Sequence, residues 1–275
     1  EKQNFTSNAS QYQAIEDTQQ LKDLVTKLKD QKIVAIDSFA DDASNFDFQL
    51  KAIALSYREN EAYYLPTGTP EKALEIVKEL SPMLLDNKIT KVGHNLKATL
   101  LTLKKYNTDI AGPLFDVMLA HYLIEPEAAH DLAILCSQYL NYDLLSTKET
   151  NLKDRLCERA ELLFQLRSKL YYELEQRRHV KLMMETEMPL SRVLASMEFE
   201  GVTIDVNALS KMSEELNLES ERVQREIFQM AGAEFNIGSP KQLGDIIFDK
   251  MKLIEKPKKT KSGQYATGED VLVGL

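Results

Sequence analysis

The segment Lys32–Phe39 constrains the fold of this chain more than any other part of the sequence. It contains the unbroken apolar run Ile33–Ile36, and polar residues lie on both sides of that run. Such a run is typical of a strand that is buried on both faces of a sheet. Asp37 follows directly, so the strand carries one carboxylate at its carboxyl end. Because functional groups of α/β proteins gather at that end of the sheet, Asp37 is the first candidate site residue.

The other apolar patterns predict a mixed α/β domain in the first part of the chain. Short apolar runs that end at turn residues predict further strands at 12–15, 51–57, 62–65 and 89–92. Amphipathic periodicity predicts helices at 18–28, 70–80, 96–106, 117–122 and 131–140, with Thr18 capping the first helix and Pro70 opening the second. Strands are therefore expected only in the first 115 residues, and helices alone after them.

The rest of the chain is predicted to be helical. Composition changes near residues 178–188, so we expect two domains, 1–182 and 183–275. Three of the expected later helices run from Asn151 toward Glu187, from Met188-Pro189 to Gly201, and from the cap Asp205 to Gly232. Two more are expected to start at Ser239-Pro240 and at a capping pair formed by Thr267 and Asp270.

Composition excludes several classes of protein. No apolar run approaches the roughly 20 residues of a membrane span, and no signal-peptide pattern opens the chain, so a cytoplasmic protein without a membrane partner is expected. Cys136 and Cys157 are too few for a disulfide framework or a metal cluster, and two buried thiols are expected instead. The first residue is Glu1 and not Met, which indicates a fragment.

A net charge of −9 argues against general affinity for nucleic acid, but one segment reverses the local charge. Residues 250–261 contain six lysines and one acid, Glu255, among Thr and other polar residues. Such a cluster is either a solvated surface or a set of contacts for phosphate groups.

Several segments, taken in order, resemble the bacterial DNA polymerase I family (family A polymerases). The segments with this resemblance are Lys91–Lys97 (KVGHNLK), Phe115–Leu119 (FDVML), Glu187–Leu190 (EMPL), Glu200–Asp205 (EGVTID), Phe235–Leu243 (FNIGSPKQL) and Lys258–Gly263 (KKTKSG). The first two resemble the 3′→5′ exonuclease domain, and the others resemble the start of the polymerase domain and its thumb. The resemblance implies a ribonuclease H-like exonuclease fold, a mixed sheet flanked by helices, followed by an all-α partial thumb.

The resemblance also implies where exonuclease ligands would lie. The family holds two divalent metals with four carboxylates, because hard cations need oxygen ligands. Asp37 matches the first Asp, but Phe39 stands at its Glu partner and Thr99 at the Asp of the second motif. Arg155 and Arg159 stand at the Tyr and the Asp of the third motif. We therefore expect a vestigial site without metal, in which Arg159 pairs with Asp37; Arg159 pointing to solvent would contradict this hypothesis.

An active metal-dependent 3′→5′ exonuclease with a rebuilt carboxylate site is the alternative. Asp41, Asp42 or Asp47 would then supply ligands, although all three are more simply solvated turn residues. His94 and His121 are expected to be ordinary packed or surface histidines, and Asp116 is expected to cap a helix.

The resemblance implies a supporting role for the fragment. The polymerase aspartates that bind Mg²⁺ belong to a palm that is absent from this sequence, so no cofactor is expected here and no polymerisation by the fragment alone. The full-length protein is expected to carry out template-directed DNA synthesis in replication and repair. The expected partners are the palm and fingers of the same protein and primer–template DNA, held through the thumb. The phosphate-contact candidates are Asn236, Ser239, Lys241, Lys258, Lys259, Lys261 and Ser262.

Overall fold

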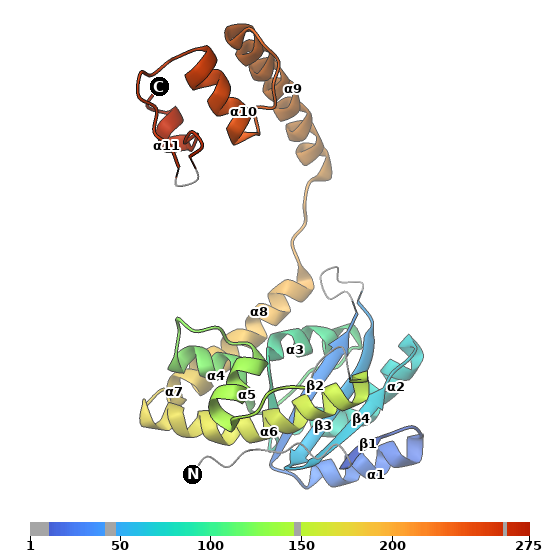
Figure 1. The fold of residues 1–275 in the computed structure, drawn as a ribbon. Coiled ribbons are helices and arrows are strands. Elements are labelled where there is room, and N and C mark those ends of the chain that lie inside the picture. Colours follow the sequence, from blue (N-terminus) through green and yellow to red (C-terminus); the bar gives the residue numbers. More distant parts are fainter. Residues whose placement is uncertain (1–10, 42–47, 146–149, 261–262) are drawn as a thin grey trace. The chain divides into compact units, whose positions relative to one another are not determined.

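The computed structural model describes residues 11–41, 48–145, 150–260 and 263–275. They form two compact units, Glu1–Gly201 and Val202–Leu275 (Figure 1). No helix among the described residues is long and apolar enough to cross a membrane.

The first unit is built on one mixed sheet in the order β1-β4-β3-β2-β5-β6. Strand β2 runs antiparallel to β3 and parallel to β5, so the Asp37 strand lies inside the sheet. The predicted mixed α/β fold is confirmed. The strands of the described residues are β1 (Tyr12–Ala14), β2 (Ile33–Ala40), β3 (Leu50–Arg58), β4 (Glu61–Pro66), β5 (Thr90–Gly93) and β6 (Leu114–Asp116).

The helices of the first unit follow the predicted pattern closely. They are α1 (Thr18–Lys29), α2 (Pro70–Leu84), α3 (Leu96–Lys105), α4 (Val117–Ile124), α5 (Leu132–Leu140), α6 (Leu152–Gln176), α7 (Val180–Leu182) and α8 (Met188–Glu200), with a π-helical turn at Met183–Glu187. The prediction that Thr18 caps α1 is wrong. Asp17 is the N-cap, and its carboxylate accepts a hydrogen bond from the Gln20 amide at 2.8 Å. A carboxylate one residue earlier reaches the free amides of the first turn, so Thr18 becomes the first helical residue.

Small residues bring α6 close to the sheet. Ala52 and Ala54 of β3 are fully buried and pack against Leu156 and Ala160 of α6. Because alternate residues of a strand share a face, Ala52 and Ala54 form one small-residue stripe under the helix. Asp37 pairs with Ala54 in the strand register, and directly paired residues point to the same face. The α6 helix therefore passes over the face of β2 that carries Asp37 (Figure 1).

The compact unit extends past the expected boundary at 182/183. Helix α8 buries Met188, Ser191 and Ala195, and it packs against α3. Its Arg192 donates hydrogen bonds to the carbonyl oxygens of Ile110 and Gly112. The chain therefore leaves the first unit only after Gly201, whose φ of +67° ends α8.

The second unit is helical. Helix α9 (Val206–Ala231) starts at the N-cap Asp205, whose side chain accepts from the Ala208 amide at 2.9 Å. It ends at Gly232, which has a φ of +60°. Helix α10 (Pro240–Gly244) continues into a π-helical turn, Asp245–Lys250. The last helix, α11 (Glu269–Leu272), is capped by the backbone of Gly268, and the expected Thr267–Asp270 capping pair is wrong because the helix starts one residue later than that pair requires.

Candidate functional site

Asp37 and Arg159 form an ion pair between β2 and α6. The Arg159 Nε donates to Asp37 Oδ2 at 2.6 Å, and its Nη2 lies 3.5 Å from Oδ1. The Asp37 side chain is almost completely buried, with 8% exposure, whereas the Arg159 side chain is 34% exposed. The hypothesis that Arg159 pairs with Asp37 is confirmed, and the guanidinium covers the carboxylate that would otherwise be free to bind a cation.

Electrostatics keep this guanidinium charged. Burial by itself lowers the pKa of Arg159, but the charge of Asp37 and the hydrogen bond to it outweigh burial and raise the pKa above its ordinary value. The guanidinium therefore keeps its positive charge beside Asp37 at the carboxyl end of β2.

Phe39 and Arg155 stand beside this pair, at the wall of a cavity of about 300 Å³. Phe39 lies two residues after Asp37 on β2, so both share a face of the strand. Arg155 lies one helical turn before Arg159 on α6. The remaining lining consists of Glu158 and four leucines, Leu144, Leu145, Leu152 and Leu156. We call this space the β2–α6 cavity. It is lined by three of the five expected vestigial positions, and one of them, Arg159, binds the fourth, Asp37.

Thr99, the fifth position, reaches the neighbouring residue of β2. It is buried on α3, and its hydroxyl lies 3.3 Å from the hydroxyl of Ser38. This contact gives each hydroxyl group one hydrogen-bond partner at a place where the family resemblance implies a carboxylate.

These residues do not fit a pair of divalent cations. Mg²⁺ needs several oxygen ligands at short distance, and Asp37 is the one carboxylate at the five positions. Both of its oxygens face a guanidinium, whose positive charge opposes a second cation. Within the described residues, no group of three or more His, Cys, Asp or Glu is arranged to hold a metal ion.

Asp41 does not supply the missing ligand. Its carboxylate pairs with Lys51 at 2.9 Å and accepts from the Gln49 amide at 2.6 Å. The hydrogen bond from Lys51 and that from Gln49 lower the pKa of Asp41, as expected for an exposed turn carboxylate. Asp42 and Asp47, the other two candidates for a rebuilt site, lie outside the described residues.

Three histidines meet where the sequence suggested isolated ones. His121 is fully buried, and its Nδ1 lies 2.8 Å from Nδ1 of His130. The Nε2 of His94 lies 2.8 Å from the carbonyl oxygen of His130. Burial, followed by the nearby His130, lowers the pKa of His121. His130 was not singled out by the sequence, because nothing in its neighbourhood distinguishes it from a loop residue.

Asp116 has the expected capping role and a second role. It accepts from the Met118 amide at 2.9 Å at the start of α4, and from the Asn95 and Leu96 amides at 3.1 and 2.6 Å. It thereby joins the start of α3 to the start of α4. Burial raises the pKa of Asp116 although these three bonds favour the charged form.

Two buried glutamates on α6 were missed by sequence reasoning. Glu158 accepts from the Tyr142 hydroxyl at 2.5 Å and from the Leu145 amide at 3.0 Å. Glu161 accepts from the Tyr12 hydroxyl at 2.6 Å and from the Asn60 amide at 2.8 Å. Burial raises the pKa of both. Charged residues on a long helix ordinarily indicate its solvated face, so the sequence carries no signal for their burial.

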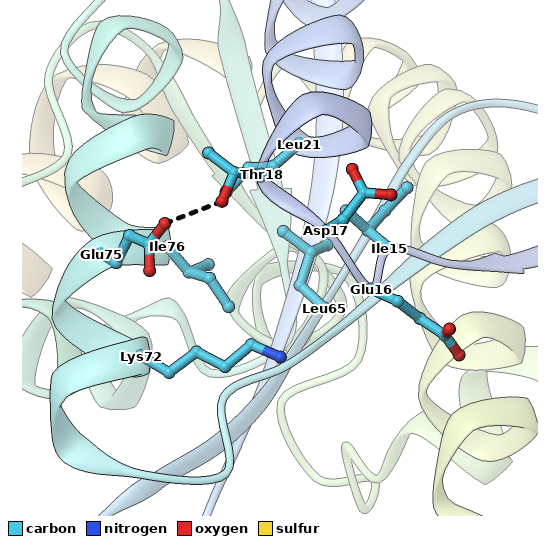
Figure 2. A pocket seen from close by; sticks show the side chains of 9 residues that line it. All are labelled: Ile15, Glu16, Asp17, Thr18, Leu21, Leu65, Lys72, Glu75 and Ile76. Carbon is cyan, nitrogen blue, oxygen red and sulfur yellow. Dashed lines mark hydrogen bonds between the residues drawn. The ribbon is translucent and has the colours of Figure 1, made fainter.

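A second cavity, of about 170 Å³, lies between α1, α2 and β4 and contains none of the predicted site residues (Figure 2). Its wall mixes apolar side chains with charges of both signs, and the Thr18 hydroxyl donates to Glu75 across it at 3.1 Å. This cavity adds nothing to the candidate site.

The predicted phosphate-contact residues of the second unit differ in whether their side chains already make hydrogen bonds within the protein. The Asn236 side chain accepts from the Gly238 amide at 3.0 Å, and the Ser239 hydroxyl accepts from the Gln242 amide at 3.4 Å, so both serve local turns. Lys241, Lys258 and Lys259 are exposed, and the Lys259 ammonium lies 5.0 Å from the centre of the Tyr265 ring. Lys261 and Ser262 lie outside the described residues.

Comparison with known proteins defines the class of the first unit. The family described as 3′-5′ exonuclease matches residues 12–169, more than half of the chain, and the family described as DNA polymerase family A matches residues 206–275. Brucella melitensis NrnC is similar to this chain in fold, with a TM-score of 0.56 at 17% identity over 69% of this chain and 92% of that one. The chain therefore carries a 3′-5′ exonuclease-type domain.

Relatives that span both units identify the family. DNA polymerase I of Geobacillus stearothermophilus is 36% identical over 75% of this chain and 25% of its own length, and that of Synechocystis sp. is 33% identical over 96% and 30%. A solved structure titled as the POL domain of Pol1 from M. smegmatis in complex with DNA primer-template and dNTP matches with a TM-score of 0.78 at 26% identity, covering 95% of this chain and 44% of that one. The chain belongs to the DNA polymerase I family and comprises its exonuclease domain and the start of its polymerase domain. It spans only 25–30% of the length of the DNA polymerases I of Geobacillus stearothermophilus and Synechocystis sp..

Proposed function

We propose that this exonuclease-type domain is catalytically silent and serves as a structural scaffold within a longer DNA polymerase. The Asp37–Arg159 ion pair is the observation that supports this most strongly. It neutralises the one carboxylate retained at the four carboxylate positions and places a cation where a metal would have to bind. The fragment itself then has no metal cofactor, and Mg²⁺ belongs to palm residues that this sequence does not contain.

The second part of the proposal concerns the whole protein. Relatives at 31–36% identity are DNA polymerases I, and the solved relative is described with primer-template DNA and dNTP. By this likeness the full-length protein carries out DNA-directed DNA synthesis in the cytoplasm, and the second unit of this chain acts as a thumb segment that contacts the DNA backbone. Lys241, Lys258 and Lys259 are its accessible contacts, with Lys261 and Ser262 beside them in sequence.

Degradation of a 3′-labelled single-stranded oligonucleotide tests the first part. The chain is incubated with the label in Mg²⁺ or Mn²⁺, beside Asp37→Ala. We expect trimming by the wild type no faster than by this variant. Metal-dependent trimming by the wild type that disappears in Asp37→Ala would show a rebuilt site and overturn the proposal.

A further inference from the structure

The cavity between α1, α2 and β4, which we call the α1–α2 cavity, has a floor of aliphatic side chains. Four buried residues form this floor, namely Ile15, Leu21, Leu65 and Ile76 (Figure 2). The volume is about 170 Å³, and an apolar cavity of about 150 Å³ already holds a molecule of the size of benzene. The α1–α2 cavity therefore has room for one small molecule with a compact aliphatic body.

Two side chains of opposite charge border this floor without pairing with each other. Lys72 and Glu75 lie one turn apart on α2, on the face of the helix that carries Ile76. The Thr18 hydroxyl of α1 donates to one oxygen of Glu75 at 3.1 Å, which leaves the other oxygen available. Within the part of the chain that the structure describes, the Lys72 ammonium makes no hydrogen bond or ion pair. An ammonium and a carboxylate oxygen are thus both available beside one apolar floor.

The other charged residues of the rim decide which kind of ion fits. Glu16 and Asp17 also line the cavity, so the rim holds three acids and one base. A ligand with a carboxylate alone would face the repulsion of the three acids, and a ligand with an ammonium alone would lie beside Lys72. A zwitterion meets an opposite charge with each of its ends. Charge complementarity therefore favours a zwitterion with an aliphatic body.

We propose that the α1–α2 cavity binds a free amino acid with a branched aliphatic side chain. The ligand's side chain packs on the aliphatic floor, its carboxylate binds Lys72, and its ammonium binds the available oxygen of Glu75. An amino acid carries both charged groups on one carbon, so it can contact two long side chains whose Cβ atoms are about 5–6 Å apart. The cavity shares no residue with the Asp37–Arg159 pair, and the proposal goes beyond a silent scaffold.

Saturation-transfer NMR of the complete chain with L-leucine tests this proposal. Three probes each lack one feature of leucine: glycine has no aliphatic body, 4-methylpentanoate has no ammonium, and 3-methylbutylamine has no carboxylate. We expect saturable binding of leucine that is tighter than binding of any of the three. Glycine should bind at least about tenfold more weakly, because burial of an aliphatic side chain accounts for that factor or more.

Two substitutions at exposed positions separate the charged contacts. Lys72→Gln should weaken binding of leucine and of 4-methylpentanoate about fivefold, the upper end for a solvent-exposed charge pair, and should not weaken binding of 3-methylbutylamine. Glu75→Gln should weaken binding of leucine and of 3-methylbutylamine but not that of 4-methylpentanoate. Its side-chain oxygen still accepts from Thr18, so the contact between α1 and α2 is kept.

Lys78→Gln is the matched control, since it removes one positive charge from an exposed position of α2 outside the cavity lining. Its affinity for leucine should equal that of the wild type. The proposal fails if leucine shows no saturable binding, if glycine binds as tightly as leucine, or if Lys78→Gln weakens leucine as much as Lys72→Gln does. Binding of 3-methylbutylamine as tight as that of leucine would show a plain cation site and would also overturn it. None of these outcomes depends on the trimming assay.

Discussion

The Nε of Arg159 lies 2.6 Å from Oδ2 of Asp37, although 122 residues separate the two in the chain. The pair joins the central strand of the sheet to the helix that crosses it. It occupies the place where the family resemblance implies a metal bound between carboxylates. In the alignment that the family resemblance implies, Arg159 stands at the place of an aspartate ligand, so this position supplies a counter-ion for Asp37 in place of a second carboxylate.

The two members of this pair should not be equally costly to remove. Arg159→Met leaves a nearly buried carboxylate without a partner, and we expect it to lower the free energy of unfolding by about 1–3 kcal/mol, below the usual cost for fully buried pairs because Arg159 is one-third exposed. Asp37→Asn should cost less, because the guanidinium keeps access to water. Urea unfolding of both variants and of the double variant measures this. An equal cost of the two single changes would contradict the asymmetry.

Restoring the carboxylates should restore metal binding. The variant Phe39→Glu/Thr99→Asp/Arg159→Asp places three acids beside Asp37, and we expect it to bind Mn²⁺ and to be stabilised by it, with trimming of 3′ ends as a further gain. The matched control is Phe39→Gln/Thr99→Asn/Arg159→Asn, which has similar shapes without charge. A folded acidic variant whose melting temperature does not respond to Mn²⁺ would show that the backbone no longer places these positions correctly.

Local sequence patterns were sufficient for the elements, and for the Asp37–Arg159 pair once the motif positions were aligned. The apolar run before Asp37 predicts β2, and the caps at Asn151 and Asp205 place the starts of α6 and α9. Helix α1 begins close to its predicted start, but its cap is Asp17, because two neighbouring residues there can both cap a helix.

What the sequence could not show depends on contacts between distant segments. Glu158 and Glu161 are buried because Tyr142 and Tyr12 approach α6 from elsewhere in the chain. The close approach of α6 depends on Ala52 and Ala54, which as isolated alanines carry no distinctive signal. Helix α8 belongs to the first unit through packing on α3, which composition at residues 178–188 does not reveal.

The His121–His130 contact predicts a pH dependence of stability. The pKa of buried His121 lies below its ordinary value of 6.5, so the native state holds the proton less tightly than the unfolded state. Its contribution to stability is therefore present above pH 6.5 and is lost as the pH falls below that value. His121→Asn removes this term, so the stability difference between wild type and variant should shrink from pH about 7.5 to about 5.5.

Chemical denaturation of both proteins at the two pH values measures that difference. Comparing the two proteins is essential, because the raised pKa values of Glu158, Glu161 and Asp116 make the native state more stable as the pH falls, and both proteins share them. A stability difference that stays constant or grows on acidification would contradict the role of His121.

Contact of the second unit with DNA should depend on Lys258 and Lys259. Both are exposed, next to an antiparallel bridge between Lys259 and Tyr265, so their ammonium groups are available to phosphates. Each phosphate contact releases about 0.9 of a counter-ion from duplex DNA, so Lys258→Ala/Lys259→Ala should reduce the slope of log affinity against log salt by roughly 2. Fluorescence anisotropy of a labelled primer–template duplex over a salt series gives this slope.

The control variant Lys181→Ala/Lys211→Ala removes two exposed lysines that each face a glutamate one helical turn away, so its slope should match that of the wild type. If both variants change the slope equally, the chain binds DNA through its general charge, and the segment with Lys258 and Lys259 has no particular role. A change of slope in the Lys258→Ala/Lys259→Ala variant alone assigns the contact with the DNA backbone to that segment.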